Sequence, residues 1–493
     1  MKRESITLTK PTDWRDTIHL ARFFILTTLA AVIILASPAP AEDLSAGFIF
    51  DRFKLTLEDG FRTEAAGPFY YSQTADSGNI LAFPPFFSRD DNPAVESHED
   101  DFLYPLFTNL RYGDERRWQF CEVISTSSGL SPDDTTAKRI TVFPFYFQQR
   151  AVDTNLNYTA VFPFYGRLKE RLFRDEIYLI MFPGYLQTRK RDVVTDNYFF
   201  PFVDVRRGDG LEGWQVWPLA GREHKDVTTR TNGFGDVITV PGHDHSFYLW
   251  PFYFSQDNGL GTTNAATFRA CIPFYAITRS PQYDDTSVLW PFFASVDNRE
   301  RKYHEWQGPW PFVIFTRGEG KHTSRVWPLF SESHDDLKEN DSYAWPFYMY
   351  TRTHSDPLDQ RRTRILFYLY SRLMVKNTET GKDRVRLDMW PFFEWHRDFD
   401  GNRRLQILAP LEPAVPDNTG IEHNWSPLWS LWRAEDNRTT GASSQSLLWN
   451  LYRRQTAPNY GKVSVLFGLY QSQKQPKGMS IRLFYLPVIR STK

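Results

Sequence analysis

The feature that most constrains the fold of this 493-residue chain is a short apolar motif in which proline stands between two apolar, mostly aromatic, residues. Its clear copies are centred on Phe83-Pro84, Tyr104-Pro105, Phe143-Pro144, Phe162-Pro163, Phe182-Pro183, Phe200-Pro201, Trp217-Pro218, Trp250-Pro251, Ile272-Pro273, Trp290-Pro291, Trp310-Pro311, Trp327-Pro328, Trp345-Pro346 and Trp390-Pro391. Neighbouring prolines are mostly 17 to 22 residues apart. Self-similarity at such a period is typical of repeat architectures, which favours one elongated or closed body over several domains.

Weaker copies of the motif fill the remaining gaps, and the step from Pro105 to Pro144 is close to two periods. These copies are Leu366-Phe367-Tyr368, Ala409-Pro410-Leu411, Ser426-Pro427-Leu428, Leu448-Trp449-Asn450, Leu466-Phe467-Gly468 and Phe484-Tyr485-Leu486. About twenty units of roughly 20 residues therefore run from near residue 65 to the last residue given. We predict a single β-repeat domain over residues 42–493.

Charged residues and turn residues keep a fixed register with the motif. Six positions after the proline stands an arginine in nine units: Arg111, Arg150, Arg189, Arg207, Arg279, Arg317, Arg352, Arg397 and Arg433. The same position holds Lys169 once and an aspartate three times: Asp90, Asp257 and Asp297. A charge at a constant offset indicates a strand end. Hairpin sequences such as Gly208-Asp209-Gly210 follow it, and these residues adopt positive φ at low cost.

The pattern predicts an all-β fold of tandem antiparallel up-and-down strands or hairpins, in a curved or closed barrel-like array. Recurrent proline and the absence of a 3.6-residue apolar stripe exclude helices. We expect a strand of about a dozen residues in each unit, with the proline near its middle and the aromatic residues stacked into a buried belt. Proline donates no ladder hydrogen bond, so we also expect the strands to bend or break at the belt.

The N-terminus predicts export. Basic residues precede an apolar run from Phe23 to Ala36, and Ala39-x-Ala41 fits a signal-peptidase site, so residues 1–41 are predicted to be a signal peptide. A retained N-terminal anchor is the alternative. In an oxidising compartment Cys121 and Cys271 could form one disulfide, or they could remain as two small apolar side chains.

The repeats resemble those of a group of uncharacterised exported proteins of Gram-negative bacteria. The resemblance is carried by Leu249-Trp250-Pro251-Phe252-Tyr253, by Leu103-Tyr104-Pro105-Leu106-Phe107 with Gly113-Asp114-Glu115-Arg116-Arg117-Trp118-Gln119 after it, and by Asn424-Trp425-Ser426-Pro427-Leu428-Trp429. It spans nearly the whole mature chain. It implies the repeat architecture and export, and it implies no activity.

We find no catalytic motif and predict no catalytic, cofactor-binding or metal-binding residue. Three segments contain residue types that metal ions bind. His243-Asp244-His245 could present two imidazoles from a strand, but it is interpreted as a polar turn after Pro241-Gly242. Asp398-Phe399-Asp400-Gly401-Asn402 resembles the start of a calcium loop and is interpreted as a hairpin turn. The acidic run from Glu96 to Asp101 is interpreted as a solvated loop.

Two functions of different class remain open. The first is a non-enzymatic structural or binding scaffold of the cell envelope, in the periplasm or attached to the outer membrane, whose partner is unknown and could be an envelope glycan or a protein. Nucleic acid is not expected, because 58 Lys and Arg nearly balance 59 Asp and Glu. The second is an integral outer-membrane β-barrel, a channel or porin-like protein. Strands that are apolar on both faces, with aromatic residues at mid-strand, favour the scaffold.

Overall fold

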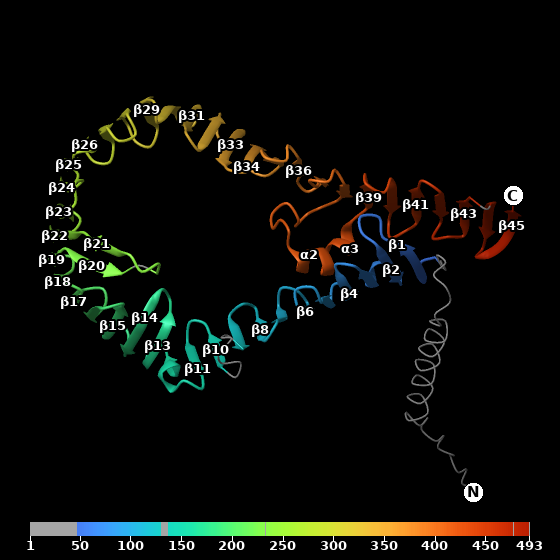
Figure 1. Cartoon of the computed structure of the whole chain (residues 1–493), viewed down its shortest axis with the longest axis horizontal. Helices are drawn as coiled ribbons and strands as arrows, with labels where there is room; N and C mark the ends of the chain where they lie inside the picture. The colour runs from blue at the N-terminus through green and yellow to red at the C-terminus, as the bar shows by residue number, and fades with distance from the viewer. Residues whose placement is uncertain (1–46, 130–136, 232, 477, 493) are drawn as a thin grey trace, which may run out of the picture. The chain divides into compact units, whose positions relative to one another are not determined.

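The computed structural model describes residues 47–129, 137–231, 233–476 and 478–492. The chain divides into two units, Met1–Leu44 and Ser45–Lys493. The predicted signal peptide, residues 1–41, lies outside the described residues. In the second unit 43 strands form one sheet, and two further strands form a separate hairpin. Figure 1 shows the strands following one another in chain order.

The helical elements are short: η1 (Gly67–Phe69), η2 (Thr154–Leu156), α2 (Thr419–Asn424) and α3 (Ser426–Trp429). The strands of the first half are β1 (Phe50–Lys54), β2 (Gly60–Ala65), β3 (Tyr70–Ala75), β4 (Gly78–Phe83), β5 (Phe87–Asn92), β6 (Ser97–Phe102), β7 (Phe107–Tyr112), β8 (Glu115–Phe120), β9 (Ile124–Ser128), β10 (Lys138–Val142), β11 (Tyr146–Arg150), β12 (Tyr158–Val161), β13 (Tyr165–Arg171), β14 (Arg174–Ile180), β15 (Tyr185–Lys190), β16 (Val193–Tyr198), β17 (Val203–Gly208), β18 (Leu211–Val216), β19 (Ala220–Lys225), β20 (Thr228–Thr231), β21 (Val237–Val240) and β22 (Gly242–Tyr248).

The strands of the second half are β23 (Tyr253–Leu260), β24 (Ala266–Cys271), β25 (Tyr275–Arg279), β26 (Tyr283–Val288), β27 (Phe293–Asn298), β28 (Tyr303–Gln307), β29 (Val313–Gly318), β30 (Lys321–Val326), β31 (Phe330–Asp335), β32 (Lys338–Tyr343), β33 (Tyr348–Ser355), β34 (Leu358–Ile365), β35 (Tyr370–Asn377), β36 (Asp383–Met389), β37 (Phe393–Arg397), β38 (Arg403–Ile407), β39 (Trp432–Asn437), β40 (Ala442–Leu447), β41 (Tyr452–Ala457), β42 (Tyr460–Val465), β43 (Tyr470–Gln475), β44 (Gly478–Leu483) and β45 (Leu486–Thr492).

The predicted fold class is confirmed. Each strand of the sheet pairs antiparallel with the strand next in sequence, so the chain runs up and down from β1 to β45. The β20–β21 hairpin leaves the sheet after β19, and β19 then pairs directly with β22. Short connections leave no length for a crossover, and antiparallel pairing follows from that.

The predicted place of the proline within a strand is wrong. The aromatic–proline motifs form the turns between strands. For example, Trp217, Pro218 and Leu219 connect β18 to β19, and the Leu219 N–H donates to the Val216 carbonyl oxygen at 2.7 Å. A proline in a turn has no ladder hydrogen bond to lose, so the sheet needs no interruption at the motif. The predicted weak copies lie in such turns too, except Ala409-Pro410-Leu411, in the long connection between β38 and β39, and Ser426-Pro427-Leu428, which begins α3.

The turns at the other end of the strands are polar. In Gly208-Asp209-Gly210, between β17 and β18, Asp209 has φ 53° and Gly210 has φ 68°, as hairpin turns that match the sheet twist require. One repeat is therefore two strands of about six residues with one aromatic–proline turn and one polar turn. The constant six-residue offset of the arginines follows from this arrangement. Residues such as Arg189, Arg207 and Arg317 lie at the last or next-to-last position of a strand that starts at the motif.

The sheet is curved and is not closed into a barrel. Among the described residues, β1 pairs with β2 and β45 with β44, and no ladder joins the two end strands. Instead, the first strands lie face to face with strands near the end of the chain, as Figure 1 shows for β1–β4 and β39–β43. Side chains join the two layers. Thr56 donates to the Ser444 hydroxyl at 2.7 Å, and Asn437 donates to the Thr56 carbonyl oxygen at 3.1 Å.

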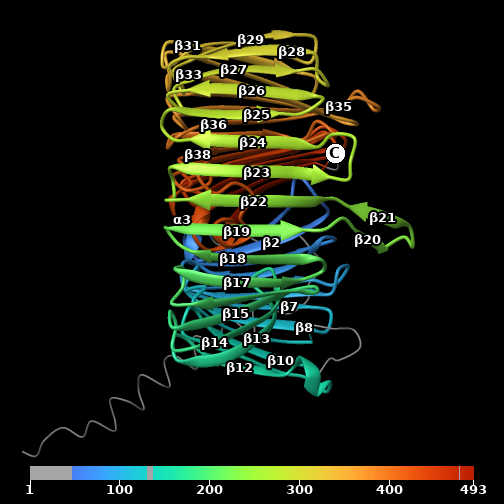
Figure 2. The ribbon, with the colours of Figure 1, turned by 90° about the vertical axis from the view of Figure 1, so that its left-hand side faces the viewer.

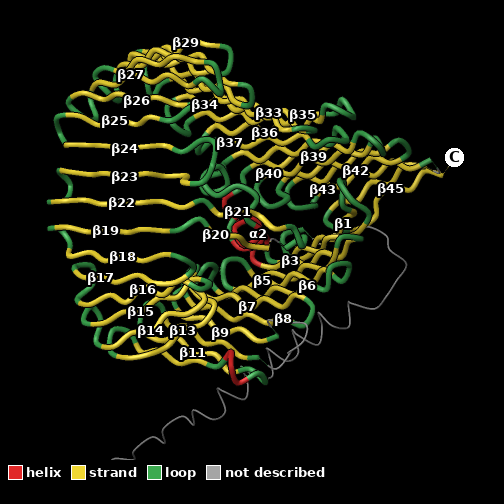
Figure 3. Tube along the Cα trace, turned by 60° about the vertical axis from the view of Figure 1, so that its left-hand side comes forward, coloured by secondary structure: helices red, strands yellow, loops and turns green. Residues whose placement is uncertain are grey.

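The long connection between β38 and β39 carries α2 and α3 and lies against the first strands. Figure 3 shows α2 beside β3 and β5. Asn424 of α2 donates to the Ser88 hydroxyl of β5 at 2.8 Å, and the Trp425 indole N–H donates to the Tyr104 carbonyl oxygen at 2.9 Å. We call the sheet face that these helices touch the inner face and the opposite face the outer face. A small apolar cluster of Phe147, Tyr158, Ala160, Leu168 and Ile177 also lies on the inner face.

Candidate functional sites

The aromatic–proline turns all lie along one edge of the sheet, which we call the aromatic edge. Figure 2 shows these turns along the left side of the view, and the polar turns with the β20–β21 hairpin on the right. The predicted buried belt is therefore wrong: Phe252, Phe274 and Phe292 are 55%, 65% and 50% exposed. Other exposed side chains of these turns include Phe86, Leu106, Phe145, Phe164, Met181, Phe199, Leu219, Leu249, Trp250, Leu289, Trp290, Trp310, Phe312, Leu329, Trp345, Phe347, Trp390, Phe392, Leu466 and Phe484.

A row of apolar side chains on the outer face adjoins the aromatic edge. It consists mainly of the first residue of each strand that leaves a motif and the last residue of each strand that enters one, and these are cross-strand partners; Gln307 at the end of β28 is an exception. Tyr185 pairs with Tyr198, Tyr198 with Val203, and Val203 with Val216. The rings of Tyr185 and Tyr198 lie 5.4 Å apart. Such contacts between aromatic and β-branched neighbours stabilise an antiparallel pair by about 0.2–1 kcal/mol.

The two edges of the sheet differ sharply in polarity. The opposite edge carries the glycine, asparagine and aspartate turns together with the strand-end arginines. Several of the arginines six positions after the proline pair with carboxylates: Arg207 lies 3.2 Å from Asp196, and Arg352 lies 2.8 Å from Asp359. The Arg352 hydrogen bond lowers the pKa of Asp359 to about 2 against the opposing effect of burial, and Arg361 adds to the lowering. Partly exposed pairs of this kind contribute little stability each, so the main consequence is a sheet that is amphipathic along its strands.

The segment His243-Asp244-His245, interpreted as a turn, belongs to strand β22. Both imidazoles point to the inner face, and their ring centroids lie 4.3 Å apart. Glu223 of β19 lies beside them, with ligand atoms of the three residues within 4.8 Å of one another, a set that could hold a divalent cation. Both oxygens of the Glu223 carboxylate already have partners, because Arg206 lies 2.7 Å from one oxygen and His243 lies 2.8 Å from the other.

A second group of potential ligands, Asp388, Glu394 and His396, lies on β36 and β37. Arg386 neutralises it, with Nε 3.0 Å from Asp388 and Nη2 3.4 Å from Glu394. Sequence reasoning missed this group because its members come from two strands and share no spacing signal. In both groups an arginine supplies the positive charge that a cation would bring.

The two segments considered as calcium sites are a hairpin turn and a strand of the sheet. Asp398 accepts backbone hydrogen bonds from Asp400 and Asn402 at 2.9 Å each, which is the expected hairpin turn between β37 and β38. The acidic run lies mostly in β6, not in a loop. Its alternating residues face opposite ways, so Asp100 pairs with Arg89 at 2.7 Å while Asp101 accepts from Thr108 at 2.8 Å.

Both cysteines are free. Cys121 is exposed in the turn between β8 and β9, and Cys271 is half-buried at the end of β24. The structure therefore contains no disulfide between Cys121 and Cys271.

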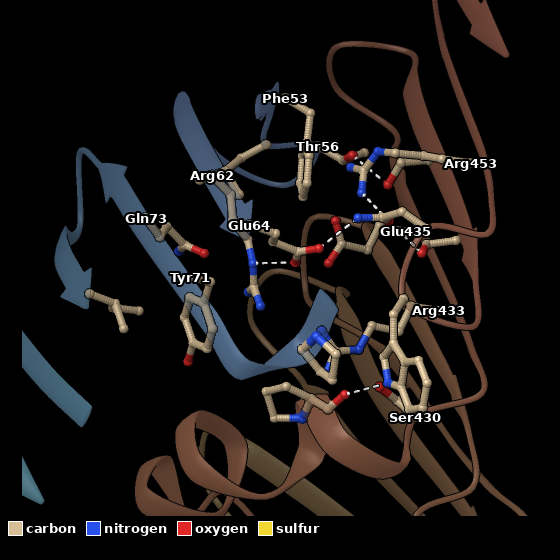
Figure 4. A pocket seen from close by; sticks show the side chains of 18 of the residues that line it. Phe53, Thr56, Arg62, Glu64, Tyr71, Gln73, Ser430, Arg433, Glu435 and Arg453 are labelled. Atoms are coloured by element: carbon tan, nitrogen blue, oxygen red, sulfur yellow. Dashed lines mark hydrogen bonds and ion pairs between the residues drawn. The ribbon is translucent and has the colours of Figure 1, made fainter. Parts of the chain in front are cut away.

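A cavity of about 240 Å³ lies between the first strands and the last, and sequence reasoning missed it. Its wall contains four arginines from distant parts of the chain: Arg62, Arg404, Arg433 and Arg453. Figure 4 shows Arg433 extending from the last strands toward Arg62 and Tyr71 on the first strands. Of these four arginines, only Arg433 belonged to the sequence pattern, as the arginine six positions after the proline of its unit. That position did not indicate that its side chain faces inward.

The electrostatics of this cavity are dominated by burial. Burial raises the pKa of Tyr71 to about 12, and burial together with repulsion from Arg62 and Arg404 lowers the pKa of Arg433 to about 10. Glu64 is fully engaged, since it accepts from Arg62 Nε at 2.8 Å and from Asn450 Nδ2 at 2.6 Å. Arg453 is buried over the Phe53 ring and donates to Asn450 Oδ1 at 3.0 Å.

No helix in the described part of the chain is long and apolar enough to cross a membrane. No protein-family model and no curated protein matches this sequence. The resemblance to exported repeat proteins therefore stays a prediction.

Proposed function

We propose that the protein is a non-enzymatic scaffold of the bacterial cell envelope that attaches to the surface of a lipid bilayer through its aromatic edge. The observation that carries the proposal is the size of this edge. A half-exposed phenylalanine leaves roughly 100 Å² of apolar surface in water, so about twenty turns expose roughly 2,000 Å². The largest apolar patch on a typical monomer is about 300–600 Å².

The chemistry of the edge favours lipid over a glycan. Its turns combine Trp, Phe, Leu and Met, and Trp is a residue that concentrates where membrane and water meet. A glycan site would need hydrogen-bonding groups beside the rings for the sugar hydroxyls. The polar side chains of the sheet lie instead farther along the strands, toward the opposite edge. A partner protein with an equally long apolar surface is the alternative that absence of vesicle binding in the experiment below would favour.

The open sheet supports the scaffold over the alternative of an integral β-barrel. A membrane-spanning sheet must pair every strand edge, because unpaired backbone groups are costly in hydrocarbon. The outer face, which would meet lipid in a barrel, carries charges such as Asp100, Asp196 and Asp359. Export to the envelope rests on the predicted signal peptide at residues 1–41.

The proposal is tested by sedimentation of the purified protein with phosphatidylcholine vesicles. The variant replaces Phe252, Phe274 and Phe292, in three consecutive turns, by serine. If half of the exposed area of each ring enters the bilayer, the three contribute about 4 kcal/mol at 25 cal/mol per Å². The lipid concentration needed for half binding should therefore rise several hundred-fold.

The matched control replaces Val237, Leu337 and Leu358 by serine. These side chains are 71%, 62% and 41% exposed, and they lie in the β20–β21 hairpin and at the polar edge. The control should bind vesicles as the unmodified protein does. Absence of vesicle binding, or equal weakening in both variants, would refute attachment through the aromatic edge.

A further inference from the structure

The strongest unexplained feature outside the aromatic edge is the charge of Arg433 in the cavity between the first and last strands. Arg433 is half-buried in β39 and faces inward, opposite Gln406 and Ser446 in the ladder. Within the described residues its side chain has neither a hydrogen bond nor an ion pair, and its Nε is buried without a partner. A guanidinium has five N–H donors, and leaving a sheltered charge uncompensated is costly.

The positive charges around Arg433 increase the free-energy cost of leaving its guanidinium group without a ligand. Among the neighbouring charges, those of Arg62 and Arg404 act most strongly on Arg433, and they add to the lowering of its pKa by burial. The carboxylates near them are already engaged: Glu64 with Arg62, and Glu422 with Arg404 at 3.2 Å. These contacts use Nε of Arg62 and Nη1 of Arg404, so both guanidinium groups have further donors to offer.

The cavity wall carries five lysine or arginine side chains and four glutamate side chains. Two of the acidic residues have no ion pair within 4.0 Å in the described chain: Glu58, which accepts hydrogen bonds from Gln73 and Ser77, and Glu435. The charge of Glu435 acts on Arg404 and Arg453, whereas it is not among the charges that act most on Arg433. The excess positive potential therefore lies on the Arg433 side of the cavity.

We propose that this cavity binds an oxyanion of the phosphate class, held by Arg433 together with Arg62 and Arg404. Forked guanidinium donors match the oxygens of a phosphate group. A volume of about 240 Å³ holds such a group with a small organic substituent, since one water takes roughly 30 Å³ of liquid volume. The buried Ser430 hydroxyl and the Trp449 ring also line the space.

The bound anion would join the two ends of the sheet. Arg62 belongs to β2, whereas Arg404 and Arg433 belong to β38 and β39. A ligand that contacts both groups stabilises the packed ends over the separated ends, and its binding therefore raises thermal stability. This inference does not depend on the attachment of the aromatic edge to lipid.

The experiment is a thermal melt and a calorimetric titration of the purified protein with inorganic phosphate, at ionic strength held constant with sodium chloride. Phosphate should raise the melting temperature where chloride does not. In Arg433→Met the affinity for phosphate should fall at least tenfold and the thermal shift should vanish. Removal of an unpaired charge should leave the phosphate-free melting temperature unchanged or higher, so a folded variant is expected.

Arg454→Gln is the matched control, because Arg454 is exposed on the outer face next to Arg453 and should keep the phosphate response. A second arm uses phosphatidylglycerol vesicles. A response to inorganic phosphate assigns the site to free phosphate compounds, and a response to the vesicles alone, lost in Arg433→Met, assigns it to a lipid headgroup. No response in either arm, or a response that Arg433→Met retains, would overturn the oxyanion site.

Discussion

Replacement of Asn424 by alanine should measure how strongly the two ends of the sheet hold together. Asn424 is wholly buried in α2 and donates to the Ser88 hydroxyl of β5 at 2.8 Å and to the Gly420 carbonyl oxygen at 3.0 Å. Loss of two hydrogen bonds costs about 1 kcal/mol each, and the space left by the amide costs about 1 kcal/mol more. The Asn424 Oδ1 is buried without a partner, and its removal returns about 1 kcal/mol.

The expected loss is therefore about 2 kcal/mol in the free energy of unfolding, measured by urea denaturation with tryptophan fluorescence. Asn79→Ala is the control, since Asn79 is exposed on β4 and its replacement should cost less than about 0.5 kcal/mol. A double-mutant cycle of Asn424→Ala with Ser88→Ala should give a coupling of about 1 kcal/mol. A coupling near zero would refute the contact between α2 and β5, and with it the packing of the sheet ends.

Three further predictions concern ionisation and thiols. Burial, with the charges of Asp101 and Asp90, raises the pKa of Glu99 to about 7, so the folded state holds this proton more tightly than the unfolded state. Stability should fall as pH rises from about 4 to 7, and Glu99→Gln should melt higher than the unmodified protein at pH 8 but not at pH 4; equal melting at pH 8 would contradict this. Asp359 should have the opposite effect on the pH dependence of stability, because its pKa is lowered to about 2. Asp359→Asn should therefore destabilise the protein at pH 7. Urea titrations should show this difference disappearing as pH falls from about 4 to 2. Thiol titration of the unfolded, unreduced protein should find both Cys121 and Cys271 free, and Cys121 should react first in the folded protein; a missing pair of thiols would indicate a disulfide.

The repeat, its period and the antiparallel order could be predicted from the sequence, because each depends on local patterns. The place of the proline could not be decided in the same way. A period of about 20 residues fits one long strand with one turn or two short strands with two turns. Apolar runs such as residues 142–147 resemble a strand buried on both faces, whereas Phe143 and Phe145 lie in an exposed turn. Proline's missing N–H was the signal that favoured the turn.

The sites depended on contacts that no local pattern encodes. Arg62 and Arg433 are separated by most of the chain, and only the curvature of the sheet brings their strands together. The β20–β21 hairpin separates Glu223 from His243 and His245 along the chain, so the pair of imidazoles could be recognised in the sequence but their neighbour could not. The polarity of each sheet face follows from strand register, and a shift of one residue in the assumed strands reverses it.

The central claim is that the aromatic edge is open to solvent in the free protein and is covered by lipid. Hydroxyl-radical footprinting, read by mass spectrometry with and without phosphatidylcholine vesicles, tests both parts in one measurement. The account predicts strong modification of Phe252, Phe274 and Phe292 in the free protein, protection of all three by vesicles, and no change at Val237 and Leu337. Protection of the three rings in the free protein, or modification that vesicles leave unchanged, would contradict it.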